Sequence, residues 1–156
     1  MSNKSHRPGH AALRRGRSSK PWQVYLVTFA TDGRSPFFAD VEAAITAARA
    51  IEDPRLWTSA RLDAWVLMPD HWHGLITLRE RDNLSMIVQR LKTNVSRQVR
   101  EVRPDIARVW AVGFHDHALR VEEAIADAMR YIVRNPVACG LVERIGDYPF
   151  WNAAWA

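Results

Sequence analysis

The sequence predicts an α+β domain built around one antiparallel sheet. Its 156 residues suffice for a single domain, and 47% hydrophobic and 25% charged residues are the balance of an ordinary globular protein. Segments with the periodicity of strands and of helices follow one another in the order β-α-β-β-α-β-α. The first six match the ferredoxin-like, split βαβ arrangement, in which helices lie on one face of the sheet, and the seventh adds a C-terminal helix.

The first predicted strand and helix lie in the N-terminal third. Residues 22–29 (WQVYLVTF) are aromatic and β-branched without a breaker, and because both faces are apolar we expect a central strand. Asp40 is a suitable N-cap for a helix that runs to about Asp53, where Pro54 stops it. The apolar stripe expected on this helix comprises Val41, Ala44, Ile45, Ala48 and Ile51.

A β-hairpin and a later strand complete the predicted sheet. Residues 62–68 and 71–78 have the composition of strands. The Pro69-Asp70 pair between them turns the chain, so we expect these two strands to pair. Residues 110–119 predict the fourth strand.

The second predicted helix is capped by Asp82 or Asn83 and ends at Pro104. Its apolar face, at helical spacing, comprises Leu84, Ile87, Val88, Leu91, Val95, Val99 and Val102. Its opposite face is polar and basic and comprises Arg90, Thr93, Asn94, Arg97 and Arg100. Such a face is most often simply solvated, but it also suits a nucleic acid.

A third helix is predicted over residues 121–134. The side chains expected to face inward are Val121, Ile125, Ala128, Met129 and Ile132. The Asn135-Pro136 pair is expected to break this helix, and Pro136 to begin a short turn that Gly140 closes.

The positive charge of the chain is concentrated at its N-terminus. The net charge is +5, and residues 1–20 contain no acid while they hold Lys4, Arg7, Arg14, Arg15, Arg17 and Lys20. The rest of the chain holds 16 basic and 17 acidic residues. We therefore predict a basic, extended arm over residues 1–20 and one domain over residues 21–156. A basic arm on a near-neutral body suggests an anionic polymer as partner, although a solubilising tail has the same composition.

Several classes of protein are not favoured by the composition. Cys139 is the only cysteine, which excludes an intrachain disulfide and a cysteine-rich zinc module. No apolar run approaches the ~20 residues of a membrane span, and the basic N-terminus lacks the apolar segment of a secretory signal. We expect a soluble, cytoplasmic protein without a membrane partner.

Two histidine pairs are candidate metal ligands. His71 and His73 are two residues apart in a predicted strand, so both point to one face, about 7 Å apart along the strand. Two imidazoles on one face can converge on a metal ion. His115 and His117 repeat the spacing. For each pair the alternative is an ordinary surface or structural histidine.

Tyr131 lies at the edge of the apolar face of the third helix, about 100° from its centre. Tyrosines at such positions usually pack the ring and expose the hydroxyl. Asn135 follows four residues later, near the same helix face, and its amide oxygen could be a third ligand beside two imidazoles. Pro136 disfavours helical geometry at Asn135.

Two motifs together resemble a known family. Residues 66–75 (VLMPDHWHGL) are similar to the signature strand of the single-tyrosine HUH transposases, and residues 131–142 (YIVRNPVACGLV) to the motif that begins with their nucleophilic tyrosine. Residues 13–18 (LRRGRS) and 113–117 (GFHDH) are similar to the branch called REP-associated tyrosine transposases. The resemblance spans roughly residues 10–152. Three positions depart from the family pattern, namely Asp70 (often Asn), Ala138 (often Arg) and Cys139 (usually Ala).

The resemblance implies a function and a set of residues for it. Tyr131 would be the nucleophile that forms a 5′-phosphotyrosine, and His71, His73 and Asn135 would hold a divalent metal ion, Mg²⁺ or Mn²⁺. The substrate implied is single-stranded DNA with hairpin-forming repetitive palindromes, handled by a monomer or a homodimer. The expected DNA contacts are Arg14, Arg15, Arg17, Arg90, Arg97 and Arg100.

Two other functions are compatible with the residues alone. One is a non-catalytic DNA-binding module of the same fold. The other is a small zinc hydrolase whose ligands would be His71, His73, His115 and His117.

Overall fold

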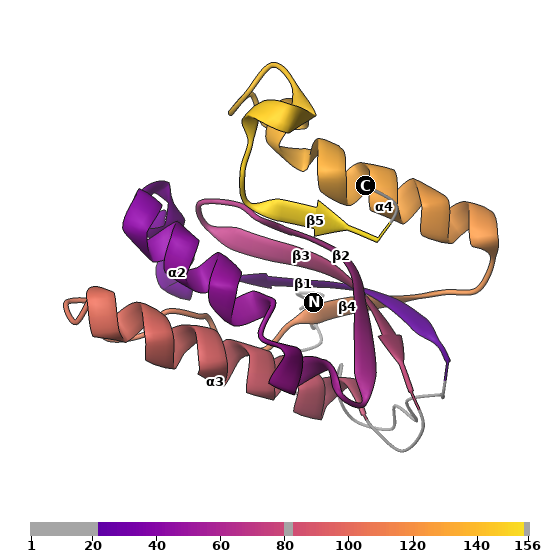
Figure 1. The fold of residues 1–156 in the computed structure, drawn as a ribbon, viewed down its shortest axis with the longest axis horizontal. Helices are drawn as coiled ribbons and strands as arrows, with labels where there is room; N and C mark the ends of the chain where they lie inside the picture. The colour runs from indigo at the N-terminus through magenta and orange to yellow at the C-terminus, as the bar shows by residue number, and fades with distance from the viewer. Residues whose placement is uncertain (1–21, 80–82, 155–156) are drawn as a thin grey trace, which may run out of the picture.

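The structure is a computed structural model that describes residues 22–79 and 83–154. One antiparallel sheet runs in the order β4-β1-β3-β2-β5 (Figure 1), which confirms the predicted α+β class. The strands are β1 (Val24–Ala30), β2 (Ala60–Leu67), β3 (His71–Leu78), β4 (His115–Leu119) and β5 (Trp151–Ala153). The first four belong to the predicted split βαβ unit, and β5, which we did not predict, extends the sheet beyond β2.

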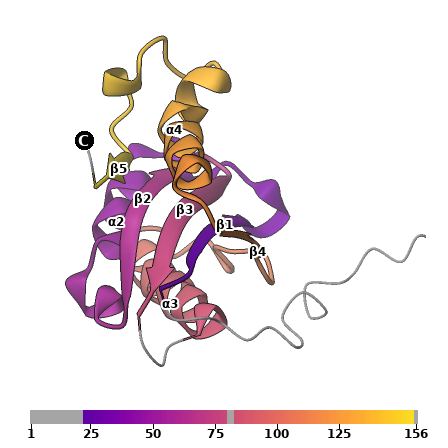
Figure 2. The ribbon, with the colours of Figure 1, turned by 90° about the vertical axis from the view of Figure 1, so that its right-hand side faces the viewer.

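Helices cover both faces of this sheet. The longer helices are α2 (Val41–Ile51), α3 (Leu84–Val102) and α4 (Glu122–Ala138). Helices α2 and α3 pack on one face and α4 packs on the other (Figures 1 and 2). The predicted C-terminal helix therefore covers the face that the split βαβ unit leaves open.

The larger core lies between the sheet and helices α2 and α3. Strand β1 contributes Tyr25, Val27 and Phe29 to it, whereas its alternate side chains are only half-buried on the α4 side. Strand β1 is internal as predicted, but only one of its faces is fully buried. Trp72 is completely buried in this core and stacks on Phe29 at 4.9 Å between ring centroids.

Helix α2 buries a different face from the one we predicted. Asp40 is its N-cap, as expected, and accepts a hydrogen bond from the backbone N–H of Glu42. Val41 and Ile45, however, are 62% and 39% exposed. The buried face consists mainly of alanines and comprises Ala43, Ala44, Ala47, Ala50 and Ile51. A hydrophobicity pattern favours the large side chains, but small ones let α2 lie close to its neighbours.

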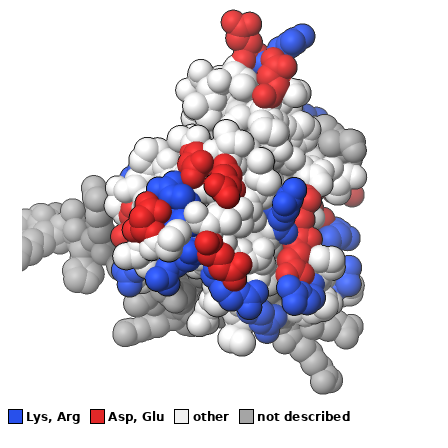
Figure 3. Space-filling model, turned by 60° about the vertical axis from the view of Figure 1, so that its left-hand side comes forward, with Lys and Arg blue, Asp and Glu red and all other residues white. Residues whose placement is uncertain are grey.

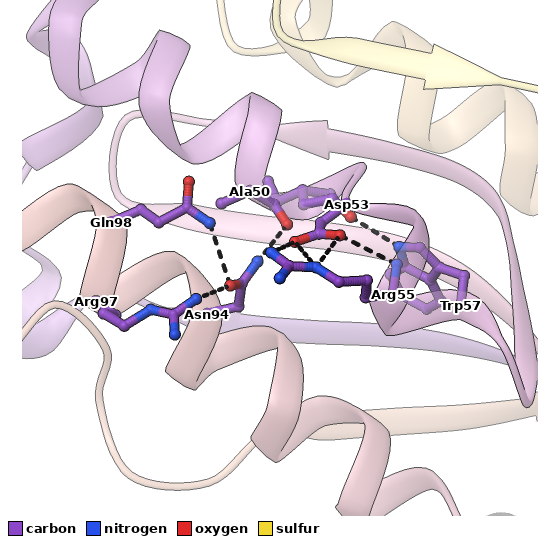
Figure 4. Close-up of polar contacts among 8 residues, drawn as sticks. Ala50, Asp53, Arg55, Trp57, Asn94, Arg97 and Gln98 are labelled. Atoms are coloured by element: carbon purple, nitrogen blue, oxygen red, sulfur yellow. Dashed lines mark hydrogen bonds and ion pairs between the residues drawn. The ribbon is translucent and has the colours of Figure 1, made fainter.

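Asn94 was predicted on the solvated face of α3, and this was wrong. It is buried, and its amide donates a 2.9 Å hydrogen bond to the carbonyl of Ala50 in α2 (Figure 4). Its Oδ1 accepts hydrogen bonds from Arg97 and Gln98. A polar residue on the inner side of α3 is tolerated because both ends of its amide are bonded.

Helix α4 continues through Pro136, whereas we predicted a break there. Pro136 is buried in the last turn, where only one backbone hydrogen bond is lost, and the N–H groups of Cys139 and Leu141 still bond to the carbonyls of Asn135 and Pro136. Gly140, with a φ of 76°, ends the helix as expected. Val121 lies before the helix and is 59% exposed, so its predicted inward position was also wrong.

The fourth strand is shorter than predicted. Only His115–Leu119 is regular, and Trp110 forms a single bridge to Thr31. Between them Gly113 has a φ of 85°, which interrupts an extended strand. The stretch 107–114 therefore runs irregularly beside α3 before it enters β4.

Candidate active site

The candidate site lies on the α4 side of the sheet. Side chains of β3 alternate, so Trp72 enters the core under α2 and α3 while His71 and His73 point to the opposite face. The two imidazole rings are in contact, with centroids 4.6 Å apart. The prediction that these histidines share one face is confirmed.

His73 is held by a threonine on the neighbouring strand. Thr28 of β1 is its partner in the sheet register, and Thr28 Oγ1 and His73 Nδ1 share a hydrogen bond of 2.7 Å. Burial, together with the nearby charges of His71 and Arg34, lowers the pKa of His73 to about 4. His73 is therefore neutral at neutral pH, with Nε2 as the nitrogen not engaged by Thr28.

His71 is held by a carboxylate. Its Nδ1 lies 2.6 Å from Asp70 Oδ1, and Arg34 donates to the other oxygen of Asp70 at 3.4 Å. Burial raises the pKa of Asp70, but the bonds from His71 and Arg34 outweigh burial and hold this pKa below its usual value. Asp70 therefore stays ionised and orients the His71 ring so that Nε2 faces away from it.

These partners of the histidines were missed in the sequence. Asp70 directly precedes His71, and a carboxylate beside a candidate metal-binding histidine is a recognised pattern that we interpreted only as a turn. Thr28 gave no such signal, because its proximity to His73 depends on the register between β1 and β3.

The arrangement of the two imidazoles fits a divalent metal ion. Each ring has Nδ1 bonded to an oxygen, which leaves Nε2 as the coordinating atom in the pattern common to metal-binding histidines. Among residues 22–79 and 83–154, no three or more His, Cys, Asp or Glu side chains form a group that could hold a metal ion by themselves. A third ligand from the described chain would be an amide or another neutral oxygen.

Tyr131 lies beside this pair. Its ring centroid is 5.4 Å from that of His73, and its side chain is 52% exposed. The other tyrosines are placed differently: Tyr25 is buried in the larger core, and Tyr148 donates a 2.5 Å hydrogen bond to the Leu67 carbonyl, with a pKa raised to about 12 by burial. Of the three tyrosines, Tyr131 alone combines an exposed ring with contact to the histidine pair.

Asn135 lies one helical turn beyond Tyr131 and is buried. Its Oδ1 accepts a long hydrogen bond of 3.6 Å from the thiol of Cys139. Its role as a metal ligand remains a prediction.

The second histidine pair shares the face but not the cluster. His115 of β4 is opposite Thr28, which is opposite His73, so the three residues form one row across the sheet. His115 and His73 are thus two strand spacings apart, about 10 Å between backbones. The backbone places the two pairs apart, which disfavours a zinc hydrolase with four histidine ligands.

Three of the six predicted DNA contacts are described by the structure, and they lie away from the candidate site. Arg90, Arg97 and Arg100 lie on α3, across the sheet from Tyr131. The range 13–18, with Arg14, Arg15 and Arg17, lies outside the described residues. On the side of the molecule drawn in Figure 3, cationic and anionic side chains are interspersed, and charge alone does not mark a binding surface there.

The family is decided by comparison with known sequences. The family model described as Transposase IS200 like matches residues 23–135. The chain belongs to this family. The match includes His71, His73, Tyr131 and Asn135, and it ends at Asn135.

Two relatives of this chain are REP-associated by description. The REP-associated tyrosine transposase of Escherichia coli K12 is 30% identical over 95 residues, which are 57% of this chain and 52% of that protein. A Haemophilus influenzae protein with a similar description is 32% identical over 94 residues, which are 54% of this chain and 53% of that protein. The chain thus spans about half the length of the curated relatives it matches.

A solved structure has the same fold. It is described as a REP-associated tyrosine transposase bound to a REP hairpin, and it superposes with a TM-score of 0.68 at 24% identity, covering 86% of this chain and 79% of that one. Across residues 22–79 and 83–154, every helix is too short or too polar to cross a membrane.

Proposed function

We propose that this IS200-like transposase cuts and rejoins single-stranded DNA at hairpin-forming repetitive palindromes, with Tyr131 as the nucleophile. The observation that carries the proposal is the exposed Tyr131 ring in contact with His73, which in turn contacts His71. The hairpin substrate is supported by the relatives described as REP-associated and by the structural neighbour bound to a REP hairpin.

The proposed reaction conserves the energy of the phosphodiester bond. The Tyr131 oxygen attacks the scissile phosphorus, the bond from phosphorus to the 3′ oxygen breaks, and that oxygen leaves as a hydroxyl after it gains a proton. The products are a 5′-phosphotyrosine and a free 3′-hydroxyl. A second 3′-hydroxyl can attack the phosphotyrosine, which rejoins DNA and restores the Tyr131 hydroxyl.

His71, His73 and Asn135 are the residues that would hold a divalent metal ion, Mg²⁺ or Mn²⁺. Such an ion supplies charge stabilisation at the phosphate oxygens. The chain's contribution is to aim the two imidazoles: Thr28 fixes the His73 ring and Asp70 fixes the His71 ring. Burial of His73, with its lowered pKa, keeps a proton from competing for the ligand nitrogen.

DNA binding is assigned to two groups of cationic side chains. Arg14, Arg15 and Arg17 of the basic arm and Arg90, Arg97 and Arg100 of α3 are the proposed phosphate contacts. A DNA-binding module without catalysis is the second candidate. The grouping of His71, His73 and Tyr131 favours the enzyme, because binding alone needs no such cluster.

The enzyme and the binding module are separated by a cleavage assay. A 5′-labelled single-stranded palindromic oligonucleotide is incubated with Mn²⁺ and the wild-type, His71→Ala or His117→Ala protein. His71→Ala should abolish cleavage and retain hairpin binding, because phosphate contacts dominate affinity. His117→Ala, a histidine on the same face but on β4, should cleave normally. Cleavage that survives in His71→Ala, or in excess chelator, would contradict the proposal.

A further inference from the structure

A basic groove lies on the side of the sheet away from Tyr131. One wall is the outer surface of α3 and the other is the irregular stretch 107–114, and the open groove between them has a volume of about 910 Å³. This volume is at the upper end of the range of ligand pockets, ~300–1,000 Å³.

All charged side chains among the described residues that line this groove are positive. The groove contains four cations, namely Lys92, Arg97, Arg100 and Arg108, and no Asp or Glu among the described residues that line it. A groove with cations and without carboxylates is complementary to an anion or a polyanion.

The groove also exposes apolar surface. Met86 and Val112 line it and are 46% and 61% exposed. Trp110 and Phe114 lie deeper and belong to the larger core. Cations beside accessible apolar surface suit a strand of nucleotides, whose phosphates need charge and whose bases need an apolar contact.

Both walls are tied together, so the groove exists before any ligand binds. Lys92 Nζ donates to the carbonyls of Ala111, at 2.9 Å, and Gly113. Arg100 Nε donates to the carbonyl of Ile106 at 3.1 Å. Lys92 and Arg100 thus brace the groove. Arg97 and Arg108, both exposed and on opposite walls, are the cations placed to meet a ligand.

The groove leads towards the candidate active site. Its second wall continues directly into β4, the edge strand of the sheet next to β1. His115, the first residue of β4, lies on the Tyr131 face and in one row with Thr28 and His73. A strand in the groove therefore has about 10 Å of sheet to cross, around one free edge, to reach His73.

We infer that the groove between α3 and residues 107–114 binds an unpaired stretch of the DNA substrate, which passes round the β4 edge to Tyr131. The inference rests on the proposed function for its choice of DNA. An unpaired strand is favoured over a duplex because the exposed Met86 and Val112 offer an apolar contact that only unpaired bases can use.

The test measures binding without cleavage, so it does not depend on the chemistry of Tyr131. In a Tyr131→Phe background, the double variant Arg97→Gln/Arg108→Gln is compared with Arg49→Gln/Arg144→Gln, which removes two exposed arginines elsewhere. The probe is a labelled oligothymidylate, titrated at several salt concentrations. The slope of log K against log salt should fall by about 1.4 in the groove variant, for two lost phosphate contacts on a single strand, and affinity should fall on the order of ten-fold.

Three outcomes would overturn the inference. In the first, the slope of log K against log salt is unchanged in the groove variant. In the second, this slope falls equally in both double variants. In the third, the groove variant loses affinity only for a blunt hairpin duplex. Failure of the proposed function would appear differently. The protein with an intact Tyr131 would form no covalent adduct with DNA, while the salt slopes of the two double variants would still differ as described.

A second measurement locates the strand and does not depend on how variants fold. An oligothymidylate that carries 5-iodouracil is irradiated with the full-length protein, and the cross-linked peptides are identified by mass spectrometry. Cross-links on the peptides that carry the exposed side chains Met86 and Val112 support the groove. Cross-links confined to other segments, with binding intact, would contradict it.

Discussion

The two faces of the central sheet come from the same strands and differ in their side chains. On the α2 and α3 side, β1 and β3 contribute Phe29 and Trp72 to a closed apolar core. On the α4 side the neighbouring residues of the same two strands are Thr28, His71 and His73, and Tyr131 of the covering helix stays half-exposed. The apolar face anchors the backbone of β1 and β3, and the polar side chains on the opposite face are positioned by that same backbone.

The difference between the two faces explains how the polar His73 can be buried in the fold. His73 is only 7% exposed, yet its ring is bonded to Thr28 and its backbone is fixed by pairing with β1 and β2. The apolar anchor of that backbone is Trp72, whose side chain points the other way. The account therefore predicts that damage to each face has a separate signature.

The largest effect on stability should come from a methyl group at Gly74. A Cβ built there lies 1.8 Å from the Trp72 ring, which is buried and stacked on Phe29 and cannot move freely. Gly74→Ala should destabilise the fold by about 1–3 kcal/mol or more, as overpacking does. Urea unfolding monitored by tryptophan fluorescence measures the loss.

Gly146→Ala is the matched control for that substitution. Nothing lies within 4 Å of a Cβ at Gly146, so the free energy of unfolding should stay the same or rise slightly. Equal changes in the free energy of unfolding for Gly74→Ala and Gly146→Ala would show that the buried Trp72 ring does not restrain β3 as described.

The polar face is probed by Thr28, which touches His73 but not the substrate in our account. Thr28→Val keeps the shape and removes the hydroxyl that fixes the imidazole, so Mn²⁺ affinity should fall by about 10–100-fold. Thr28→Ser restores the oxygen and should recover most of it. Calorimetric titration of the metal measures both, and stability should change little beside Gly74→Ala. Wild-type affinity in Thr28→Val would mean that the hydroxyl does not position His73.

The stability of the metal-free protein should also depend on pH. The pKa of His73 is about 4 in the folded chain, against an ordinary value of 6.5, so between these values the unfolded chain binds more protons. The stability contribution of neutral His73 is present above pH 6.5 and is lost as the pH falls towards 4. The decline should be shallower in His73→Gln. Parallel declines in the two proteins would contradict the buried, neutral His73.

Much of the fold follows from the sequence because it depends on local patterns. The composition of residues 71–78 predicted the strand, and the side-chain period of two in a strand predicted the shared face of His71 and His73. Asp40 was correctly identified as an N-cap, and Asn83 was one of the two N-caps expected for α3. The wrong predictions have local patterns too, but tertiary packing decided them. In α2 the alanines are buried, whereas Val41 and Ile45 are exposed. Pro136 lies inside α4 and does not end it.

The candidate site was predictable only in part. Spacing indicated the histidine pair, and the resemblance to the HUH transposases supplied Tyr131, whose approach to His73 no periodicity could show. Thr28 depends on strand register, and the groove depends on how residues 107–114 run beside α3. Both are long-range properties of the folded chain.

The central claim is that Tyr131 is the nucleophile of the polar face. Wild-type and Tyr131→Phe proteins are incubated with Mn²⁺ and a single-stranded palindromic oligonucleotide, and covalent protein–DNA adducts are mapped by mass spectrometry. The account predicts an adduct on the peptide containing Tyr131 in the wild type and none in Tyr131→Phe, with hairpin binding retained because the exposed ring keeps its place beside His73. An adduct that persists in Tyr131→Phe, or that maps to Tyr25 or Tyr148, would contradict it.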